Sequence, residues 1–274
     1  MSDKTTICVV NYKTEELTKL CLRSIRKYSK NENIEVIVVD NNSADSSLDY
    51  LRTVKWIKLV ERNAEEMNDG SGENIKGSMA HGSALDCGLR AASADSKYFI
   101  ALHSDTFVKK EGWLKFLLDK FTDDNIMVVG CGKLDLKPWW ERTLKRCTDI
   151  KEWIRRMNPH HRERANFYIR SICAVYRKDI FEKEDVWFTT GIADGFTIGK
   201  KLYYEIVKRG YDTVVVDEFK MANYIDHLAH ATMVLNPEEF STRKKTDKKY
   251  YKRLKKVLDR KIVHEILADT SLDQ

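Results

Sequence analysis

The first 105 residues alternate two kinds of segment: short, largely apolar runs, and stretches whose apolar residues recur at the spacing of a helix face. Strands separated by helices in this way are typical of βαβ units, whose strands run parallel in one sheet. The predicted strands are residues 5–12, 34–43, 56–62 and 97–105, and the predicted helices are residues 14–29, 47–54 and 82–93. This alternation predicts an α/β fold with a Rossmann-like, mainly parallel sheet flanked by helices.

Polar residues follow three of these apolar runs, at the point where each predicted strand ends. They are Asn11 with Tyr12, then Asp40 with Asn41, Asn42 and Ser43, and then His103 with Ser104 and Asp105. Ligands of open parallel sheets bind at the carboxyl ends of the strands. We therefore expect these three groups to lie at one edge of the sheet and to share a ligand.

Beyond residue 110 the alternation is less regular. Helices are predicted at residues 111–123 and 195–211, with Gly210 as a helix stop signal, and strands at residues 126–132, 167–181 and 212–217. Residues 137–166 form a basic segment rich in tryptophan. We interpret residues 1–240 as one domain, with a first half at 1–110 and a second half at 111–240.

The positive charge of the chain is concentrated near its end. Residues 241–261 hold eleven Lys or Arg and two Asp, so this segment contributes +9 to a net charge of +6 and the rest of the chain carries −3. Residues 241–274 are therefore predicted to form a basic helical tail, which could bind an anionic membrane or present a solvated face. The slightly acidic remainder argues against a nucleic-acid partner.

Other bulk features favour a cytoplasmic protein. No apolar run approaches the roughly 20 residues that span a bilayer. The first residues lead directly into a predicted strand, so we expect no signal peptide. The six cysteines are scattered without a CxxC pair, which favours a reducing compartment.

Four sequence elements, in this order and at this spacing, resemble glycosyltransferase family 2 over roughly residues 5–235. They are "VVNYKTEELTKLCLRSI", "VIVVDNNSADSS", "HGSALDCGLRAASADSKYFIALHSD" and "GIADGFTIGKKLYYEIVKRGY". The resemblance implies a GT-A fold and inverting transfer of a sugar from a nucleotide-diphosphate donor. It makes the first half of the domain nucleotide-binding and the second half acceptor-binding.

The resemblance also implies roles for particular residues. Asp40 matches the carboxylate that recognises the base of the donor, and the backbone from Val10 to Tyr12 lies beside that base. Asp105 matches the last carboxylate of the DxD motif, which holds a divalent ion, Mn²⁺ or Mg²⁺, against the donor diphosphate. The nucleotide-sugar-binding residues are expected to be Val10, Asn11, Tyr12, Asp40, Asn42, His81, Ser104 and Asp105. His81 is included because it opens the predicted helix at 82–93, where it could contact a phosphate or merely cap the turn.

Asp194 in "GIADGF" matches the catalytic base, a carboxylate just before a helix, which must lie within reach of the acceptor hydroxyl. His227 and His230 follow the last predicted strand, and we prefer His227 as a second metal ligand beside Asp105. The chain departs from the family pattern at three positions. His103 replaces the first DxD aspartate, Asp86 replaces an amide, and Ala193 replaces an acid before Asp194.

The expected function is transfer of a hexose or deoxyhexose from a UDP- or TDP-sugar to a glycan, lipid-linked or other hydroxyl acceptor, in polysaccharide or glycoconjugate biosynthesis. The alternative is a catalytically weakened GT-A-like protein that binds nucleotide sugars. The location is expected to be the cytoplasm, with peripheral contact at the inner face of the membrane through the basic tail. Acceptor selectivity is predicted to lie in residues 137–172.

Overall fold

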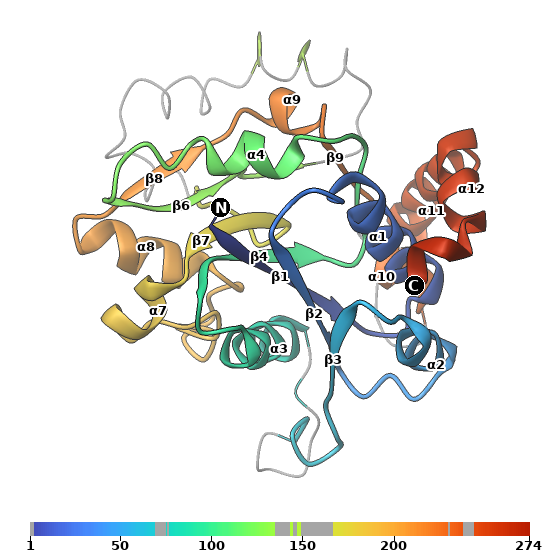
Figure 1. The fold of residues 1–274 in the computed structure, drawn as a ribbon, viewed down its shortest axis with the longest axis horizontal. Helices are drawn as coiled ribbons and strands as arrows, with labels where there is room; N and C mark the ends of the chain where they lie inside the picture. Colours follow the sequence, from blue (N-terminus) through green and yellow to red (C-terminus); the bar gives the residue numbers. More distant parts are fainter. Residues whose placement is uncertain are drawn as a thin grey trace.

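The computed structural model describes residues 3–68, 75, 77–134, 143–144, 147–148, 167–229, 231–237 and 244–274. Within these residues, seven strands form one sheet in the order β3-β2-β1-β4-β7-β6-β8 (Figure 1). The strands are β1 (Lys4–Asn11), β2 (Ile34–Asp40), β3 (Ile57–Glu61), β4 (Ser96–His103), β6 (Ile126–Gly130), β7 (Cys173–Arg177) and β8 (Asp212–Val215). Neighbouring strands are parallel except at β7, which is antiparallel to both β4 and β6. The predicted mainly parallel sheet is confirmed.

Helices cover both faces of this sheet. One face packs against α1 (Glu15–Tyr28), α2 (Ser46–Thr53) and α4 (Trp113–Leu118), and the other packs against α3 (Gly77–Ala91), α7 (Asp179–Glu184) and α8 (Lys200–Lys208). Two short helices, α9 (Glu218–Met221) and α10 (Ala231–Leu235), flank β9 (Ile225–His227) in sequence. Because both faces are buried, the strands need apolar residues at every position, which explains the unbroken apolar runs.

Alternate side chains of β1 enter the two cores. Ile7 and Val9 belong to one buried cluster, and Cys8 and Val10 to the other. On the second face α3 comes very close to the sheet: a Cβ added to Gly88 would lie 2.3 Å from the Cys8 Sγ atom. Glycine at position 88 is what allows this helix to approach the central strand.

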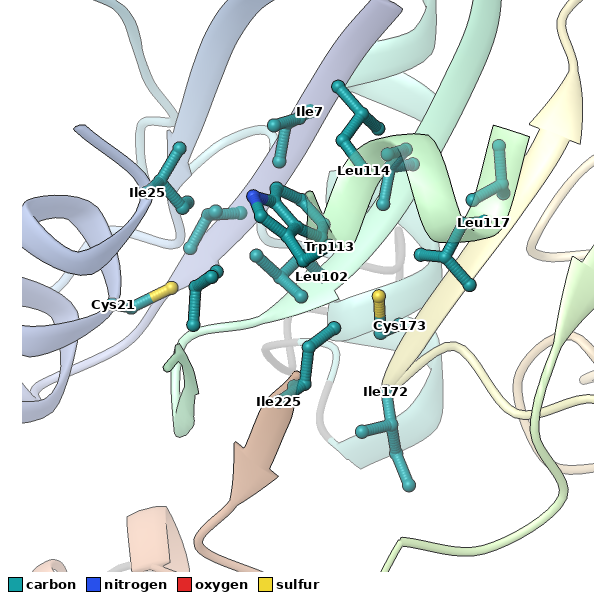
Figure 2. Close-up of a cluster of buried hydrophobic side chains, with 14 of the residues drawn as sticks. Ile7, Cys21, Ile25, Leu102, Trp113, Leu114, Leu117, Ile172, Cys173 and Ile225 are labelled. Carbon is teal, nitrogen blue, oxygen red and sulfur yellow. The ribbon is translucent and has the colours of Figure 1, made fainter. Parts of the chain in front are cut away.

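The first core is organised around Trp113, which is fully buried. Figure 2 shows its indole ring among Ile7, Leu102 and Cys173, which come from β1, β4 and β7. The indole Nε1–H donates to the Ser29 hydroxyl at 2.9 Å, so the buried polar atom is satisfied. Truncation of such a residue to Ala typically costs about 3–5 kcal/mol.

The C-terminal segment forms helices that belong to the fold. It consists of α11 (Lys244–Leu258), α12 (Lys261–Ala268) and the 3₁₀ helix η2 (Thr270–Asp273). Leu254, Val257, Val263 and Ile266 are buried in a third cluster with residues of α1, and the red tail helices lie beside α1 in Figure 1. In the described residues, no helix combines the length and apolar character that crossing a membrane requires.

Several predicted boundaries were wrong. The helix expected at 195–211 begins at Lys200, because Gly199 adopts a left-handed conformation with φ 69°. Its predicted end is confirmed: Gly210 has φ +87°, and the amides of residues 210 and 211 donate to the carbonyls of residues 207 and 206. The strand expected at 167–181 covers Cys173–Arg177 and is followed by α7.

Candidate functional site

The carboxyl ends of β1, β2 and β4 meet at one edge of the sheet, as the sequence predicted. Asn11 pairs in register with Asp40, and Val10 pairs with His103. A short ribbon outside the main sheet, formed by β5 (Thr106–Val108) and β9, continues from this edge. The polar residues that end the three strands are thus brought together by strand register.

The Asp40 carboxylate is the centre of a buried hydrogen-bond network. Its Oδ1 accepts from the Asn11 Nδ2 and from the Ser43 hydroxyl, each at 2.6 Å, and its Oδ2 accepts from the Ser43 backbone N–H at 2.9 Å. Asn11 in turn accepts at its Oδ1 from the Thr18 hydroxyl on α1 at 2.7 Å. Asp40 is fully buried, so these bonds fix the loop after β2.

The other predicted donor-binding residues lie around this network. Val10 is buried in the core, and Tyr12 is half-buried with the Lys13 ammonium 5.4 Å from its ring centre. Asn42 is exposed at the tip of the loop, with a φ of 56°. Ser104 is buried in the turn between β4 and β5. These residues all lie at, or next to, the strand ends.

His103, Asp105 and His227 form a compact group. One ligand atom from each residue lies within 4.8 Å of the others. His103 ends β4 and Asp105 lies in the following turn, while His227 is brought from the last quarter of the chain by β9, where it pairs with Thr106. The Asp105 Oδ1 lies 3.3 Å from the His227 Nε2 and 3.7 Å from the His103 Nδ1.

The orientation of the His227 ring fits a metal ion. Its Nδ1 lies 2.7 Å from the Leu134 carbonyl oxygen, so Nδ1 carries the proton and donates it. In the neutral ring the Nε2 lone pair then faces the Asp105 Oδ1, a buried atom for which the described residues offer no hydrogen-bond partner. Two acceptors that face each other need a proton or a metal ion between them, and metal-bound histidines commonly donate their other N–H to a carbonyl in this way.

The charge state of Asp105 agrees with such a site. Burial raises the pKa of this carboxyl, but the imidazoles of His227 and His103, when protonated, more than offset burial and hold the pKa well below its usual range. A divalent ion that replaces those protons would favour the ionised carboxylate in the same way. The carboxylate is therefore ionised across the whole physiological pH range. An ionised, buried carboxylate between two imidazoles provides three donor atoms for a divalent ion.

His81 lies next to this group, against the ring of His103. The prediction that His81 is at the start of a helix was wrong. It does not open a helix: α3 begins at Gly77, so His81 is in the second turn. Its ring lies edge-on against that of His103, with centroids 4.7 Å apart. Burial and, to a smaller extent, the neighbouring His103 together lower the pKa of His81 to about 3, so His81 is neutral at physiological pH.

Asp194 is exposed in a run of turns before α8, with its backbone N–H donating to the Gly191 carbonyl. The expectation that it directly precedes a helix was wrong, since α8 begins six residues later. The loop is held against α3 close to His81: the space beside Gly82 is filled by Ile192, with 2.9 Å between the Ile192 Cδ1 and an added Cβ. α3 thus contacts both the Asp194 loop and the His103 ring.

The sequence left the role of Asp86 open, and the structure supplies one. Its Oδ1 accepts from the Phe188 N–H at 2.7 Å, and its Oδ2 accepts from the Thr189 N–H at 3.2 Å and hydroxyl at 2.7 Å. Asp86 therefore anchors the start of the loop that leads to Asp194. A buried acid in the middle of an apolar helix face was the sequence signal for such a structural role.

The structural role of Arg62 was not predicted from the sequence. Arg62 follows β3 and is 8% exposed. Its guanidinium donates to the Asn41 Oδ1 at 2.9 Å, the Ser83 hydroxyl at 3.0 Å and the Glu66 carbonyl at 2.7 Å. It therefore ties the loop after β2 to α3. His230 and most of the segment 137–166 lie outside the described residues.

Comparison with known proteins shows which protein family the chain belongs to. A model of the family described as glycosyl transferase family 2 matches residues 6–184, more than half of the chain. The chain belongs to glycosyltransferase family 2. No curated protein sequence matches this family 2 member.

Two solved structures share its fold. The mannosyltransferase PcManGT from Pyrobaculum calidifontis, in complex with GDP-Man and Mn²⁺, has a TM-score of 0.53 and 16% identity, over 78% of this chain and 55% of that chain. S. aureus TarS 1–349 has a TM-score of 0.51 and 15% identity, over 92% of this chain and 70% of that chain. The GT-A fold is confirmed, and the chain spans about half the length of the mannosyltransferase.

Proposed function

We propose that this protein transfers a sugar from a nucleoside-diphosphate donor to a hydroxyl acceptor, with inversion at the anomeric carbon. The observation that carries the proposal is the His103–Asp105–His227 group at the carboxyl edge of the sheet in a family 2 chain. It combines a buried ionised carboxylate with imidazole donors at the edge where open α/β sheets bind ligands. The GT-A fold relative solved with GDP-Man and Mn²⁺ supports the same class of donor and ion.

The donor is proposed to lie across the ends of β1, β2 and β4. Tyr12 and Asn42 are accessible there and would contact the base, while Asp40 and Asn11 hold the loop beneath in position. Ser104 lies in the turn between β4 and β5 and would face the diphosphate, and His81 packs against the neighbouring His103 ring. UDP and TDP are the proposed nucleotides, and residues 1–110 and 111–240 the proposed donor and acceptor halves.

Asp105 and His227 would hold a divalent ion, Mn²⁺ or Mg²⁺, against the diphosphate. When bound, such an ion neutralises the charge that grows on a departing nucleoside diphosphate. The chain's own contribution is a rigid pair of ligands: strand pairing of Thr106 with His227 fixes their spacing, and the Leu134 carbonyl fixes the ring of His227. Binding therefore needs little rearrangement of the protein.

Asp194 is the proposed catalytic base. The acceptor hydroxyl oxygen attacks the anomeric carbon, the bond from that carbon to the diphosphate oxygen breaks, and the hydroxyl proton passes to the Asp194 carboxylate. Attack from the face opposite the leaving group inverts the configuration. Support comes from the position of Asp194 in an accessible loop that α3 holds near the ion-binding group.

The basic face of the tail is the proposed contact with an anionic membrane, which would bring a lipid-linked acceptor near. On α11 the apolar Leu254 and Val257 are buried, whereas Lys252, Lys255 and Lys256 are exposed. Each lysine near an anionic surface contributes about 1 kcal/mol to binding. A peripheral position at the inner face of the membrane would follow.

Calorimetric titration of UDP, TDP and GDP with Mn²⁺, repeated with EDTA, tests the donor site, and product analysis with the matching sugar nucleotide tests transfer. Metal-dependent binding of one nucleotide followed by transfer is the expected result. Binding without transfer to any hydroxyl acceptor would replace the proposal with a sugar-nucleotide-binding protein. Failure to bind all three nucleotides would overturn the donor site.

A further inference from the structure

We propose that His103, standing where the family pattern has an aspartate, is a third ligand and makes this a two-histidine, one-carboxylate site that favours transition metals such as Mn²⁺, Co²⁺ or Zn²⁺ over Mg²⁺. The inference rests on the proposed function for the location of the ion, but it concerns ion selectivity alone. It is carried by the geometry of the three side chains and by the groups that orient them.

The three donor atoms converge on one point. The Asp105 Oδ1 is flanked by the His227 Nε2 at 3.3 Å and by the His103 Nδ1 at 3.7 Å. The two imidazole rings lie edge-on to each other, with an interplanar angle of 74° and centroids 5.7 Å apart. All three donor atoms lie within 4.8 Å of one another, and the two separations from the Asp105 Oδ1 are those of ligands arranged around a single ion about 2.0–2.2 Å away.

Both rings are oriented by a partner on the nitrogen that faces away from Asp105. The Nδ1 of His227 donates to the Leu134 carbonyl at 2.7 Å, and the Nε2 of His103 lies 3.3 Å from the Ser171 hydroxyl. For His227 this leaves Nε2 as the lone-pair donor, and for His103 it leaves Nδ1 as the lone-pair donor when Nε2 donates to the Ser171 oxygen. Such outer partners are a regular feature of metal-binding histidines and contribute to affinity.

His81 restricts the His103 ring further. It packs edge-on against that ring at 4.7 Å, and its own buried Nε2 has no hydrogen-bond partner in the described part of the chain. Its ring therefore fills the space on that side of His103. The ring of His103 is thus held with its Nδ1 toward Asp105.

The donor set determines which ions are favoured. One carboxylate and two neutral imidazoles carry a charge of −1, whereas two aspartates and one histidine would carry −2. Mg²⁺ binds oxygen ligands, dehydrates reluctantly and depends on negative charge. Imidazole suits the first-row transition metals, and two histidines with one carboxylate leave open positions for other ligands. Diphosphate oxygens would take those positions.

The test measures ion binding to the full chain without nucleotide or acceptor. Free Mn²⁺ is followed by its electron paramagnetic resonance signal, with Mg²⁺ as competitor, for wild type, His103→Asp and His264→Ala. His264 is exposed on α12 and serves as the matched control for loss of one imidazole. We expect His103→Asp to make Mg²⁺ at least about tenfold more effective as a competitor, and His264→Ala to change nothing.

A second readout uses the wild-type chain and does not depend on folding of the variant. In Co²⁺-loaded protein, two ligand imidazoles with protonated outer nitrogens should give two exchangeable, strongly shifted N–H resonances in the proton NMR spectrum. Ser171→Ala removes the partner of one of them and should broaden that signal alone.

One shifted N–H resonance, or equal Mg²⁺ competition in wild type and His103→Asp, would overturn the role of His103. These outcomes are distinct from failure of the proposed function. Selective ion binding without sugar transfer leaves this inference standing, and sugar transfer with Mg²⁺ as effective as Mn²⁺ removes it.

Discussion

Arg23 on α1 and Asp273 at the end of the chain form a buried, two-pronged ion pair. The Arg23 Nε donates to one carboxylate oxygen of Asp273 at 2.9 Å and an Nη donates to the other at 2.5 Å. The side chains are 4% and 11% exposed, and the Tyr50 hydroxyl also donates to Asp273 at 2.8 Å. This pair fastens the tail to the first helix of the domain.

We expect Arg23→Ala to lower the free energy of unfolding by about 3–5 kcal/mol, because it leaves the Asp273 carboxylate buried without its cation. Chemical denaturation followed by circular dichroism measures this. Arg26→Ala is the matched control: Arg26 is exposed on the same helix and donates to the Gln274 carbonyl. It should cost less than about 1 kcal/mol. Equal effects of the two substitutions would show that the tail is not fastened by Asp273.

Replacement of Asp105 by Asn should remove the response to metal. If Mn²⁺ at about 100 times its dissociation constant stabilises the wild type by about 2.7 kcal/mol, Tm rises by roughly 5–10 °C. In Asp105→Asn this rise should disappear, because the charged ligand is lost. A thermal melt with and without Mn²⁺ measures it.

Asp226→Asn is the control for that experiment. Asp226 precedes His227 but points to the opposite face of β9, where it pairs with Lys109 at 3.2 Å and Arg260 at 2.7 Å. We expect it to keep the metal response and to lower stability by about 1–3 kcal/mol through loss of charged hydrogen bonds. A metal response that survives in Asp105→Asn would remove Asp105 from the site.

Asp194→Asn should reduce transfer by at least about a hundredfold, because the amide cannot accept the acceptor proton. Donor binding, measured by calorimetry, should be unchanged. Glu182→Gln, which neutralises an exposed acid on nearby α7, should leave both quantities unchanged. Normal turnover of Asp194→Asn would assign the base to another residue.

Asp86→Ala should destabilise the protein by about 1–3 kcal/mol, since three donors in the loop at residues 188–189 lose their acceptor. Because the same loop leads to Asp194, transfer should fall while metal binding is retained. Limited proteolysis between residues 186 and 195, compared with wild type, would report the loosened loop. Identical cleavage rates would contradict the anchoring role.

Charge reversal of Lys252, Lys255 and Lys256 to Glu tests the membrane contact. All three are exposed, so folding should be unaffected, whereas sedimentation with liposomes of anionic lipid should fall sharply. Deleting the whole tail is unsuitable, because it would expose the cluster around Leu254 and Val263. Equal sedimentation of the variant and wild type would exclude this face as the contact.

The sequence predicted the sheet and its ligand edge well, because short, largely apolar runs such as residues 34–39 are typical of strands buried on both faces. The strand ends then placed Asn11, Asp40 and His103 together by register alone. The domain division stays a prediction. The role of Asp194 likewise stays a prediction, since its loop contains no regular element that would fix its distance from the ion-binding group.

Contacts between residues far apart in the chain could not be predicted from the sequence. Nothing local indicates that Arg23 meets Asp273, or that the Leu134 carbonyl selects the proton position of His227. The helix start at Lys200 was misplaced, because the residues before it have helical character while Gly199 requires a left-handed backbone. The lysine-rich tail was expected to be an appendage, because charged residues dominate its composition and obscure the four apolar residues that it buries against α1.

The β5–β9 ribbon has a consequence for biosynthesis. Asp105 and His227 are separated by 122 residues, and at about 5–20 residues per second the ribosome needs roughly 6–24 s to make that stretch. The first four strands and α3 emerge long before β9. A nascent chain can therefore assemble the edge of the sheet while it still lacks the strand that completes the ion site, so metal loading has to wait until β9 has been made.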